Sequence, residues 1–263
     1  MDLGINEKVA LVAASSRGIG YACAEALARE GAAVVMFSRD MERIREAASR
    51  VTEKTGAEVL ALAGDVRDAD DIARITAEAR TWKGGVDILV TNAGGPPPIP
   101  FEEATDKHWE DTVDLLLLSA VRLIRGVLPG MVERGWGRVV ALSSIACRQP
   151  ADVLLLSNSI RIGVHGLLKT LTAHHAKDGV TFNTVMPGYT WTERAKEVAA
   201  ARAKASGRSI EEIMEGIKER SPARRIGRPE EVAAAVVFLA SESAAFINGT
   251  GIMVDGGESR GLF

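Results

Sequence analysis

The sequence predicts an α/β fold in which a parallel sheet is covered by helices on both faces. Short runs of β-branched and other apolar residues alternate along the chain with longer segments whose apolar residues recur at helical spacing. The first run leads directly into a glycine-rich turn at residues 13–20 and then into a helical segment. These observations favour a doubly wound sheet of Rossmann type, and the absence of an internal repeat or low-complexity linker predicts a single domain over residues 1–263.

Seven segments have the short, near-continuous apolar character of strands buried on both faces of a parallel sheet. They are residues 9–12, 33–37, 59–63, 86–91, 138–142, 181–186 and 252–254. The main helix candidates are residues 41–52, 68–81, 106–133, 153–176 and 229–240. Residues 192–220 are charged and Ala-rich with no strand before them, so we expect an inserted helical lid, with an ordinary surface helix as the alternative.

Composition limits the classes of partner. With 32 Lys and Arg against 35 Asp and Glu, the net charge of -3 disfavours nucleic acid and membrane surfaces and favours a small-molecule substrate. No apolar run approaches the roughly 20 residues that a bilayer span needs, and the N-terminus lacks the features of a signal peptide, so we expect a cytoplasmic protein. Cys23 and Cys147 fit neither a disulfide framework nor a zinc site, and His174 and His175 lack partners at zinc spacing. We therefore expect no metal.

The glycine-rich turn predicts a dinucleotide site, because backbone N–H groups at such a turn approach a pyrophosphate. About 20 residues further on, near the end of the second strand, this fold recognises the adenosine ribose. A carboxylate there binds the ribose hydroxyls and repels a 2′-phosphate, whereas this chain offers Ser38 and Arg39, with Arg17 nearby in the turn. These residues favour NADP(H). The alternative is that Asp40 binds the ribose and that NAD(H) is the cofactor.

Several motifs then occur together along the chain. They are AASSRGIG at residues 13–20, Asp65 and Val66 after the third strand, TNAG at residues 91–94, Pro187, Gly188 and Thr192 after the sixth strand, and the segment 225–257. Over almost its whole length the chain resembles the short-chain dehydrogenases/reductases, and especially the 3-oxoacyl-acyl-carrier-protein reductases. The resemblance implies that Asp65 and Val66 flank the adenine, that residues 92–94 support the sheet and the ribose, and that Thr192 binds the nicotinamide carboxamide.

The turn and the resemblance together define the expected cofactor site. Its residues are Ala14, Ser16, Arg17, Gly18, Ile19, Gly20, Ser38, Arg39, Asp65, Val66, Asn92, Ala93, Gly94, Arg161, Pro187, Gly188 and Thr192. Ala14 departs from the family pattern, because it replaces the first glycine of the turn. Since a Cβ is present there, we expect a negative φ at Ala14 and a slightly displaced pyrophosphate.

The catalytic positions depart further from the family, whose members reduce carbonyls with a Ser, a Tyr, a Lys and an Asn. Ser144 stands at the Ser position, but the residues 13 and 17 positions further on, where Tyr and Lys belong, are Ser157 and Arg161. The Asn position on the preceding long helix holds Leu116. A serine is far less acidic than a phenol, and Arg161 stays protonated and cannot pass protons along. Ser157 keeps a hydroxyl, Arg161 keeps a positive charge, and Leu116 avoids a polar group that would lack partners. Because the replacements are chemically patterned in this way, we favour a repurposed site over a decayed one.

Other residues are candidates for the missing acid or for contacts at the site. Tyr189 could supply a proton, although shaping the pocket is the more common role of this position. Cys147 could be a nucleophile, with a small packing residue as the stronger alternative. His165 lies one turn beyond Arg161 and is assigned to helix packing or a subunit interface, while Asn158 is expected to face the cofactor. Residues 94–101, GGPPPIPF, predict a stiff loop over the pocket.

Three functions are compatible with these features. The first is an NADP(H)-dependent oxidoreductase that transfers hydride to or from a carbonyl, alcohol or related small molecule with a non-standard proton donor. The second is an inactive NADP(H)-binding or regulatory homologue, and the third, a lyase or isomerase, ranks last because no unpaired base stands out. The family resemblance also implies a homotetramer, built through the long helices that contain Leu116 and Arg161 and through the C-terminal segment.

Overall fold

A parallel sheet forms the centre of the protein in the computed structural model, which describes residues 2–151 and 154–261. Within those residues the strand order is β3-β2-β1-β4-β5-β6-β7, and every neighbouring pair is parallel. The strands are β1 (Val9–Ala13), β2 (Ala33–Ser38), β3 (Val59–Ala63), β4 (Ile88–Thr91), β5 (Gly137–Leu142), β6 (Val180–Pro187) and β7 (Gly251–Val254). The order reverses direction after β1, so β1 and β4 mark the switch point at which such sheets bind ligands. The predicted fold class is confirmed.

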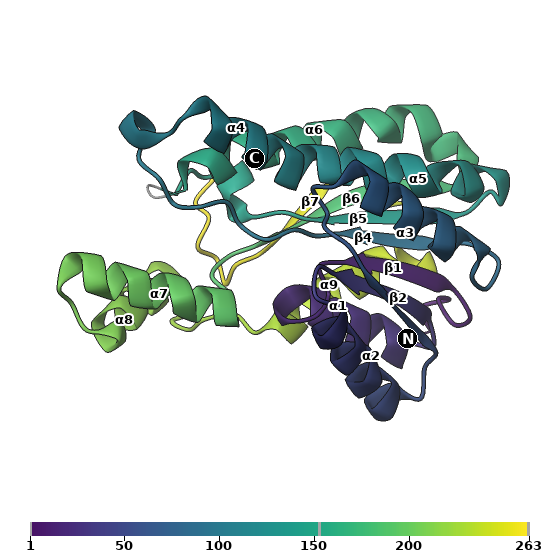
Figure 1. The fold of residues 1–263 in the computed structure, drawn as a ribbon, viewed down its shortest axis with the longest axis horizontal. Helices are drawn as coiled ribbons and strands as arrows, with labels where there is room; N and C mark the ends of the chain where they lie inside the picture. Colours follow the sequence, from purple (N-terminus) through teal and green to yellow (C-terminus); the bar gives the residue numbers. More distant parts are fainter. Residues whose placement is uncertain (1, 152–153, 262–263) are drawn as a thin grey trace.

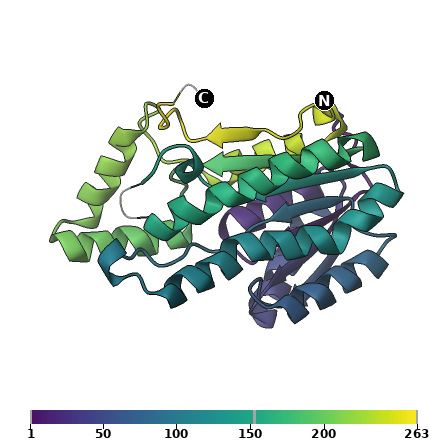
Figure 2. The same ribbon diagram turned by 90° about the horizontal axis from the view of Figure 1, so that it is seen from above.

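Helices cover both faces of this sheet (Figure 1). They are α1 (Gly18–Arg29), α2 (Met41–Thr55), α3 (Ala69–Thr81), α4 (Asp106–Thr112), α5 (Ser119–Glu133), α6 (Leu155–His175), α7 (Glu193–Ser206), α8 (Ile210–Arg220) and α9 (Pro229–Leu239). Helices α1, α2 and α9 pack on one face, and α3, α5 and α6 pack on the other. Figure 2 shows α5 and α6 lying across the sheet, with α7 and α8 at one end of the molecule. Val153, the predicted start of α6, lies outside the described residues.

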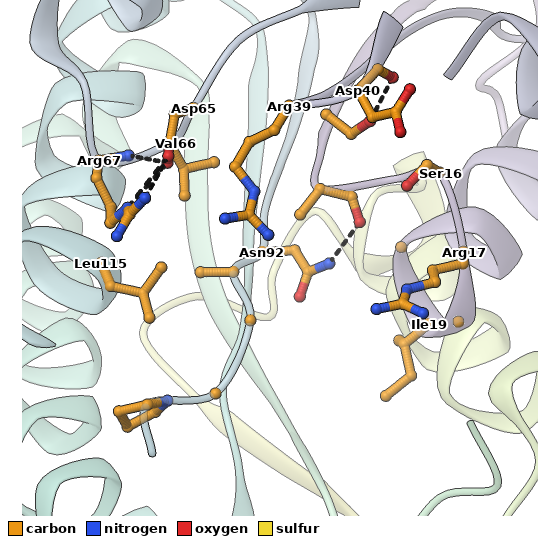
Figure 3. A pocket seen from close by; sticks show the side chains of 18 of the residues that line it. Ser16, Arg17, Ile19, Arg39, Asp40, Asp65, Val66, Arg67, Asn92 and Leu115 are labelled. Atoms are coloured by element: carbon orange, nitrogen blue, oxygen red, sulfur yellow. Dashed lines mark hydrogen bonds and ion pairs between the residues drawn. The ribbon is translucent and has the colours of Figure 1, made fainter. Parts of the chain in front are cut away.

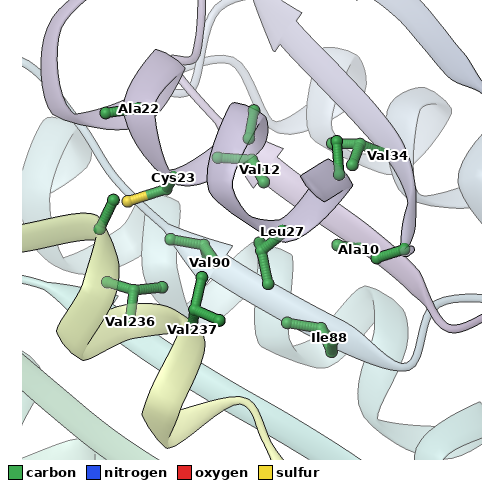
Figure 4. Close-up of a cluster of buried hydrophobic side chains, with 14 of the residues drawn as sticks. Ala10, Val12, Ala22, Cys23, Leu27, Val34, Ile88, Val90, Val236 and Val237 are labelled. Atoms are coloured by element: carbon green, nitrogen blue, oxygen red, sulfur yellow. The ribbon is translucent and has the colours of Figure 1, made fainter. Parts of the chain in front are cut away.

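The core beneath α1 and α9 is built from small and β-branched side chains (Figure 4). Leu27 of α1, Val236 of α9 and Val90 of β4 belong to one buried cluster, and all three are fully buried. Cys23 is part of this layer as a free cysteine, and its complete burial raises the pKa of its thiol far above the ordinary value. Cys23 is therefore an inert packing residue.

The long segment 106–133 is not one regular α-helix, as its sequence predicted. A π-helical turn, Val113–Leu118, separates α4 from α5, and the Ser119 N–H bonds to the carbonyl of Asp114, five residues back. Such turns insert one extra residue and are frequent at functional sites. The turn contains Leu116, so the irregularity lies at one of the positions that departs from the family pattern.

The same run, Asp106–Glu133, is long and apolar enough by length and composition to cross a membrane, although we expected no such run. A core helix of a globular protein passes the same test, and 39% of its most apolar window is buried inside the protein. Leu123, Ile124 and Val127 supply much of that burial against the sheet. One helix of this kind is weak evidence, and we assign it no membrane role.

Residues 192–220 form two helices, α7 and α8, which project beyond the end of the sheet (Figure 1). Thr192 and Ser209 cap them, because each hydroxyl accepts a hydrogen bond from a backbone N–H three residues later. The two helices share a small apolar cluster of their own around Ala199, Met214 and Ile217. The helical character matches the sequence prediction, while the role of a lid stays a prediction.

Candidate functional site

A cavity of about 660 Å³ opens at the carboxyl ends of β1 to β4 (Figure 3). Most of the expected cofactor residues line it together: Ala14, Ser16, Arg17, Gly18, Ile19, Gly20, Ser38, Arg39, Asp65, Val66, Asn92, Ala93, Gly94 and Thr192. Arg161, Pro187 and Gly188 do not line this cavity. Residues 94–101, called the prolyl loop below, were predicted to lie over the pocket. Residues 94–97 of this loop form one wall of the cavity.

The turn after β1 presents backbone donors to this cavity. Helix α1 begins at Gly18, its cap residue Arg17 makes no side-chain capping bond, and no acidic residue lies in the first turn. The first N–H groups of a helix carry partial positive charge and bind anions when nothing caps them. A Cβ at Gly20 would lie 2.5 Å from the Ala14 carbonyl oxygen and 2.8 Å from Asn92 Nδ2, so only glycine permits this close packing.

Ala14 has a φ of +47°, so the expectation of a negative φ is wrong. The family's glycine is replaced, but the backbone keeps the left-handed conformation that favours glycine. Flanking hydrogen bonds hold the chain there, because Ser15 N–H donates to the Phe37 carbonyl at 3.2 Å and Asn92 Nδ2 donates to the carbonyls of Ala13 and Ala14 at 3.3 Å each. The turn retains its shape at the cost of local strain.

At the end of β2, the carboxylate of Asp40 is already committed to local structure. It caps α2 by accepting a hydrogen bond from Arg43 N–H at 3.1 Å, and it forms an ion pair with Arg43 Nε at 3.3 Å. Arg39 instead extends into the cavity beside Asn92 (Figure 3). Arg43 also lines the cavity and was missed from the sequence, where only its position three residues after the cap could have indicated it. This end of the cavity is therefore cationic.

After β3, Asp65 is held by Arg67. The Arg67 guanidinium donates to both carboxylate oxygens, with Nη2 at 2.7 Å from Oδ2 and Nε at 3.2 Å from Oδ1, and Arg67 N–H donates to Oδ1 at 3.0 Å. Burial alone would raise the pKa of Asp65, but these hydrogen bonds and the charge of Arg67 bring it below its ordinary value. Asp65 therefore stays ionised and fixed in orientation.

Several cavity residues were not expected from the sequence. Besides Arg43 and Arg67, they are Gly64, His108, Asp111, Thr112, Leu115 and Glu193. His108, Asp111, Thr112 and Leu115 lie on α4 and the π-helical turn, far from any glycine motif. Their approach to the cavity depends on how the long helix packs, which no local pattern shows.

The expected catalytic residues lie at the end of β5 and on the first turns of α6. Ser144 caps a short 3₁₀ helix, Ile145–Cys147, and its Oγ accepts from Ala146 N–H at 3.1 Å. Ser157 is buried, and its Oγ accepts a hydrogen bond from Arg161 Nε at 3.0 Å. Arg161 Nη1 lies 3.5 Å from the Leu142 carbonyl oxygen. The 3₁₀ helix packs against α6, so these groups occupy neighbouring elements.

A second, much smaller cavity of about 10 Å³ lies beside Arg161. Leu116 and Ser143 line it, and it shares Asn92 and Ala93 with the large cavity. The structure thus brings Leu116 and Arg161 together next to the large cavity. A volume of this size is close to that of one water-sized probe.

Burial of Arg161 also affects its ionisation. Desolvation lowers the pKa of the guanidinium, and a weaker effect of the neighbouring Cys147 opposes it. The ordinary value is so high that the group keeps its charge.

The other candidates have structural partners. The Tyr189 hydroxyl donates to the Ala195 carbonyl at 2.8 Å, its ring packs with the apolar cluster of α7 and α8, and burial raises its pKa. These contacts favour the pocket-shaping alternative over proton donation. Asn158 bonds the backbone of Ala151 through both ends of its amide, at 3.3 and 2.9 Å, rather than facing the cofactor.

Two further side chains pack within α6 and its surroundings. His165 Nδ1 lies 3.0 Å from Thr184 Oγ1, and burial, followed by the charges of Arg148 and Lys169, lowers the pKa of this imidazole. Cys147 Sγ lies 3.0 Å from Ser143 Oγ. Among residues 2–151 and 154–261, no three His, Cys, Asp or Glu side chains gather as a metal site.

A doubly wound parallel sheet with an uncapped helix start and a cationic cavity at its switch point defines a dinucleotide-binding α/β protein. Residues 13–259 match the family model described as enoyl-(acyl carrier protein) reductase. The human dehydrogenase/reductase SDR family member 4 is 35% identical over 95% of this chain and 87% of its own length. The chain therefore belongs to the short-chain dehydrogenase/reductase family of oxidoreductases.

Other relatives extend this similarity. Acetoacetyl-CoA reductase of Cupriavidus necator is 29% identical over 98% of this chain and all of its own length. Among solved structures, L-sorbose reductase of Gluconobacter frateurii, complexed with NADPH and L-sorbose, matches all of both chains with a TM-score of 0.95 and 36% identity. The actinorhodin polyketide ketoreductase with NADPH matches 96% of this chain and 97% of its own, with a TM-score of 0.92 and 32% identity.

Proposed function

We propose that this protein is an NADP(H)-dependent oxidoreductase that acts on a carbonyl, an alcohol or a related small molecule through a non-standard proton donor. The observation that carries the cofactor preference is the end of β2, where Asp40 caps α2 while Arg39 and Arg43 line the cavity. A 2′-phosphate would meet guanidinium groups there rather than a free carboxylate. NADPH in the sorbose reductase and ketoreductase structures supports the same choice.

The residues present fit a dinucleotide. Uncapped N–H groups at the start of α1 suit the pyrophosphate, the bare Gly20 lets the turn pack tightly, and the ionised Asp65 suits an adenine amino group. Thr192 approaches the same turn, since a Cβ at Gly18 would lie 3.5 Å from Thr192 Cγ2. When bound, the nicotinamide supplies or accepts the hydride.

At the reaction site the chain itself offers hydroxyls and a fixed positive charge. Ser144 and Ser157 lie on elements that pack against each other, and Arg161 Nε–H donates a hydrogen bond to the buried Ser157 Oγ. None of these groups is a good acid near neutral pH, and Leu116 offers no polar atom to a proton relay. We infer that the proton reaches the product from water or from the substrate itself.

The alternative is an NADP(H)-binding or regulatory homologue without turnover. It shares the intact cavity and the altered catalytic positions, so cofactor affinity cannot separate the two. Turnover can separate them: an active enzyme oxidises NADPH in the presence of at least one class among ketones, imines and enoyl compounds, and an inactive homologue oxidises it with none.

The cofactor preference is tested by titrating the protein with NADPH and NADH. We expect Arg39→Ala to weaken NADPH binding about 10–100-fold, because a charge-assisted hydrogen bond contributes about 1.5–3 kcal/mol, and to leave NADH binding unchanged. Arg45→Ala removes an exposed cation of α2 that does not line the cavity, and it should alter neither affinity. Equal affinities of the parent for both cofactors would contradict the proposal.

We further propose a cytoplasmic homotetramer. Apolar side chains lie exposed on both surfaces that the family resemblance assigns to subunit contacts: Ile162 on α6 is 46% exposed, and Phe246 before β7 is fully exposed. Exposed apolar groups of this kind are common at interfaces between subunits.

A further inference from the structure

We propose that Arg67 is a positioning residue that makes the cofactor cavity select a 6-aminopurine base, by holding the carboxylate of Asp65 in one orientation. The inference rests on the proposed NADP(H)-dependent function and deepens it, because it concerns which base the same cavity accepts. The family resemblance implies that Asp65 and Val66 flank the base, and it assigns no role to Arg67. All three residues line the large cavity.

Three donors of Arg67 bind the Asp65 carboxylate (Figure 3). Nη2 lies 2.7 Å from Oδ2, Nε lies 3.2 Å from each of the two oxygens, and the backbone nitrogen lies 3.0 Å from Oδ1. A carboxylate offers about four acceptor positions, so there is room for one more donor. Because Asp65 lines the cavity, a bound ligand can supply that donor.

A second arginine, Arg122 of α5, holds the loop that carries Arg67. Arg122 Nη1 donates to the Arg67 carbonyl at 2.8 Å, and Nη2 donates to Asp114 Oδ1 at 3.0 Å. Asp114 belongs to the π-helical turn and directly precedes Leu115, which lines the cavity. Arg122 therefore ties the loop after β3 to the turn that brings Leu115 to the same cavity.

The contact between Arg67 and Asp65 has more effect on the carboxylate than on the stability of the fold. The Arg67 side chain is 47% exposed, and exposed ion pairs contribute little to stability. A planar guanidinium that binds both oxygens of a carboxylate does fix the orientation of that carboxylate. We therefore expect the function of Arg67 to be visible in ligand recognition.

Arg67 also keeps Asp65 in the form that only accepts hydrogen bonds. Burial alone would raise the pKa of Asp65, but the hydrogen bonds and charge of Arg67 outweigh burial, and the charge of Arg39 acts in the same direction. The pKa of the carboxyl therefore lies below its ordinary value, and Asp65 is ionised near neutral pH.

The hydrogen-bonding edge of the base decides which purine such a carboxylate binds. Adenine carries an amino group at C6, which donates to a carboxylate, whereas hypoxanthine carries a carbonyl oxygen there, which a carboxylate repels. Hypoxanthine does have a donor at the neighbouring N1, which a carboxylate that is free to turn can reach. The three donors of Arg67 oppose that turn. Selection of the base therefore depends on Arg67 as well as on Asp65.

A binding experiment tests this selection without turnover. The parent and each variant are titrated by fluorescence with NADPH and with reduced nicotinamide hypoxanthine dinucleotide phosphate, which differs from NADPH only at the base. We expect the parent to prefer NADPH by about tenfold or more, because a charge-assisted hydrogen bond is exchanged for a repulsion. Arg67→Met should reduce this preference to less than about threefold. Arg67→Lys should restore only part of it, because an ammonium group cannot bind both oxygens in a fixed plane.

Arg80→Met is the matched control, since it removes an exposed arginine of α3 that does not line the cavity, and it should keep the full preference. An affinity for the hypoxanthine dinucleotide close to that of the parent shows that a variant is folded. Arg122→Met leaves Arg67 in place and removes only the outer contacts, so it should lower the preference less than Arg67→Met does.

Two results would overturn the role of Arg67 and leave the NADP(H)-dependent function intact. One is a parent that binds both dinucleotides equally well, and the other is a folded Arg67→Met variant that keeps the full preference for NADPH. A parent that binds neither dinucleotide would instead overturn the proposed function itself.

Discussion

Ala14 shows how one residue can differ from a family pattern while the backbone around it does not. Its φ of +47° is costly for a residue with a Cβ, roughly 1–2 kcal/mol. Asn92 donates a hydrogen bond to the Ala14 carbonyl, and Gly20 packs closely against the same carbonyl. These contacts hold Ala14 in the left-handed conformation. The sequence alone suggested that the chain would relax to negative φ, and the neighbouring contacts explain why it does not.

We expect Ala14→Gly to raise the free energy of unfolding by about 0.5–1 kcal/mol. Glycine relieves the left-handed strain, and the greater freedom of the unfolded chain cancels part of the gain. Denaturant unfolding of the cofactor-free protein measures it. Ala13→Gly, in the buried extended strand β1, should lower stability instead. A destabilised Ala14→Gly variant would show that the turn is not strained.

Residues predicted from the sequence differ in how firmly local pattern determines them. The turn glycines, Arg39 and Asp65 follow directly from strand ends, and the structure places them in one cavity. Tyr189 could not be judged in this way, because its hydroxyl direction depends on the carbonyl of Ala195 in the following helix. Arg67 was missed for a related reason. Its contribution to the site is the bidentate contact with the Asp65 carboxylate, and that contact depends on the conformation of the loop.

At the scale of elements, the strands and most helices were predictable because their apolar spacing follows from burial on a two-sided sheet. The division of segment 106–133 was not predictable, since a π-helical turn alters the packing register without any proline or glycine to mark it. This turn sets which side chains of α4 reach the cavity. His108, Thr112 and Leu115 were missed because their approach to the cavity depends on the packing of α4 and the π-helical turn.

An ion pair joins the start of α9 to the segment that precedes it, and its contribution to stability can be tested. Arg225, in the segment leading from α8, binds Glu231 of α9 through two hydrogen bonds, at 2.7 and 2.6 Å. With a further bond from the Arg228 backbone, this contact lowers the pKa of Glu231 from 4.5 to about 2. A lowered folded-state pKa means that the stabilisation is fully present above about pH 4.5 and is lost as the pH falls toward 2.

We therefore expect Glu231→Gln to lower the free energy of unfolding near pH 7 by less than about 1 kcal/mol, because the pair is exposed on the arginine side. The difference from the parent should shrink as the pH falls below 4.5. Denaturant titrations at several pH values measure it. Glu230→Gln, at the exposed neighbouring position, serves as the control and should show no such pH dependence. A pH-independent difference would contradict the role of the ion pair.

At the scale of the whole molecule, the exposed apolar residues bear on assembly. We expect analytical ultracentrifugation of the parent to show a tetramer, and Phe246→Asp or Ile162→Asp to produce smaller species, because each places a charge in a proposed contact surface. Phe101→Asp, at a 70% exposed position in the prolyl loop, is the matched control and should remain tetrameric. A monomeric parent would refute the assembly.

At the same scale, we proposed that the dinucleotide cavity adjoins a reaction site that uses a non-standard proton donor. Ser157, Arg161 and Leu116 lie together beside that cavity, so they can be changed as a group. The most direct measurement is the rate of NADPH-dependent ketone reduction by the triple variant Leu116→Asn, Ser157→Tyr, Arg161→Lys, compared with the parent. The account predicts that the triple variant gains ketone reduction while NADPH affinity stays unchanged. A parent that already reduces ketones as fast as the triple variant, or a triple variant that binds NADPH and gains nothing, would contradict it.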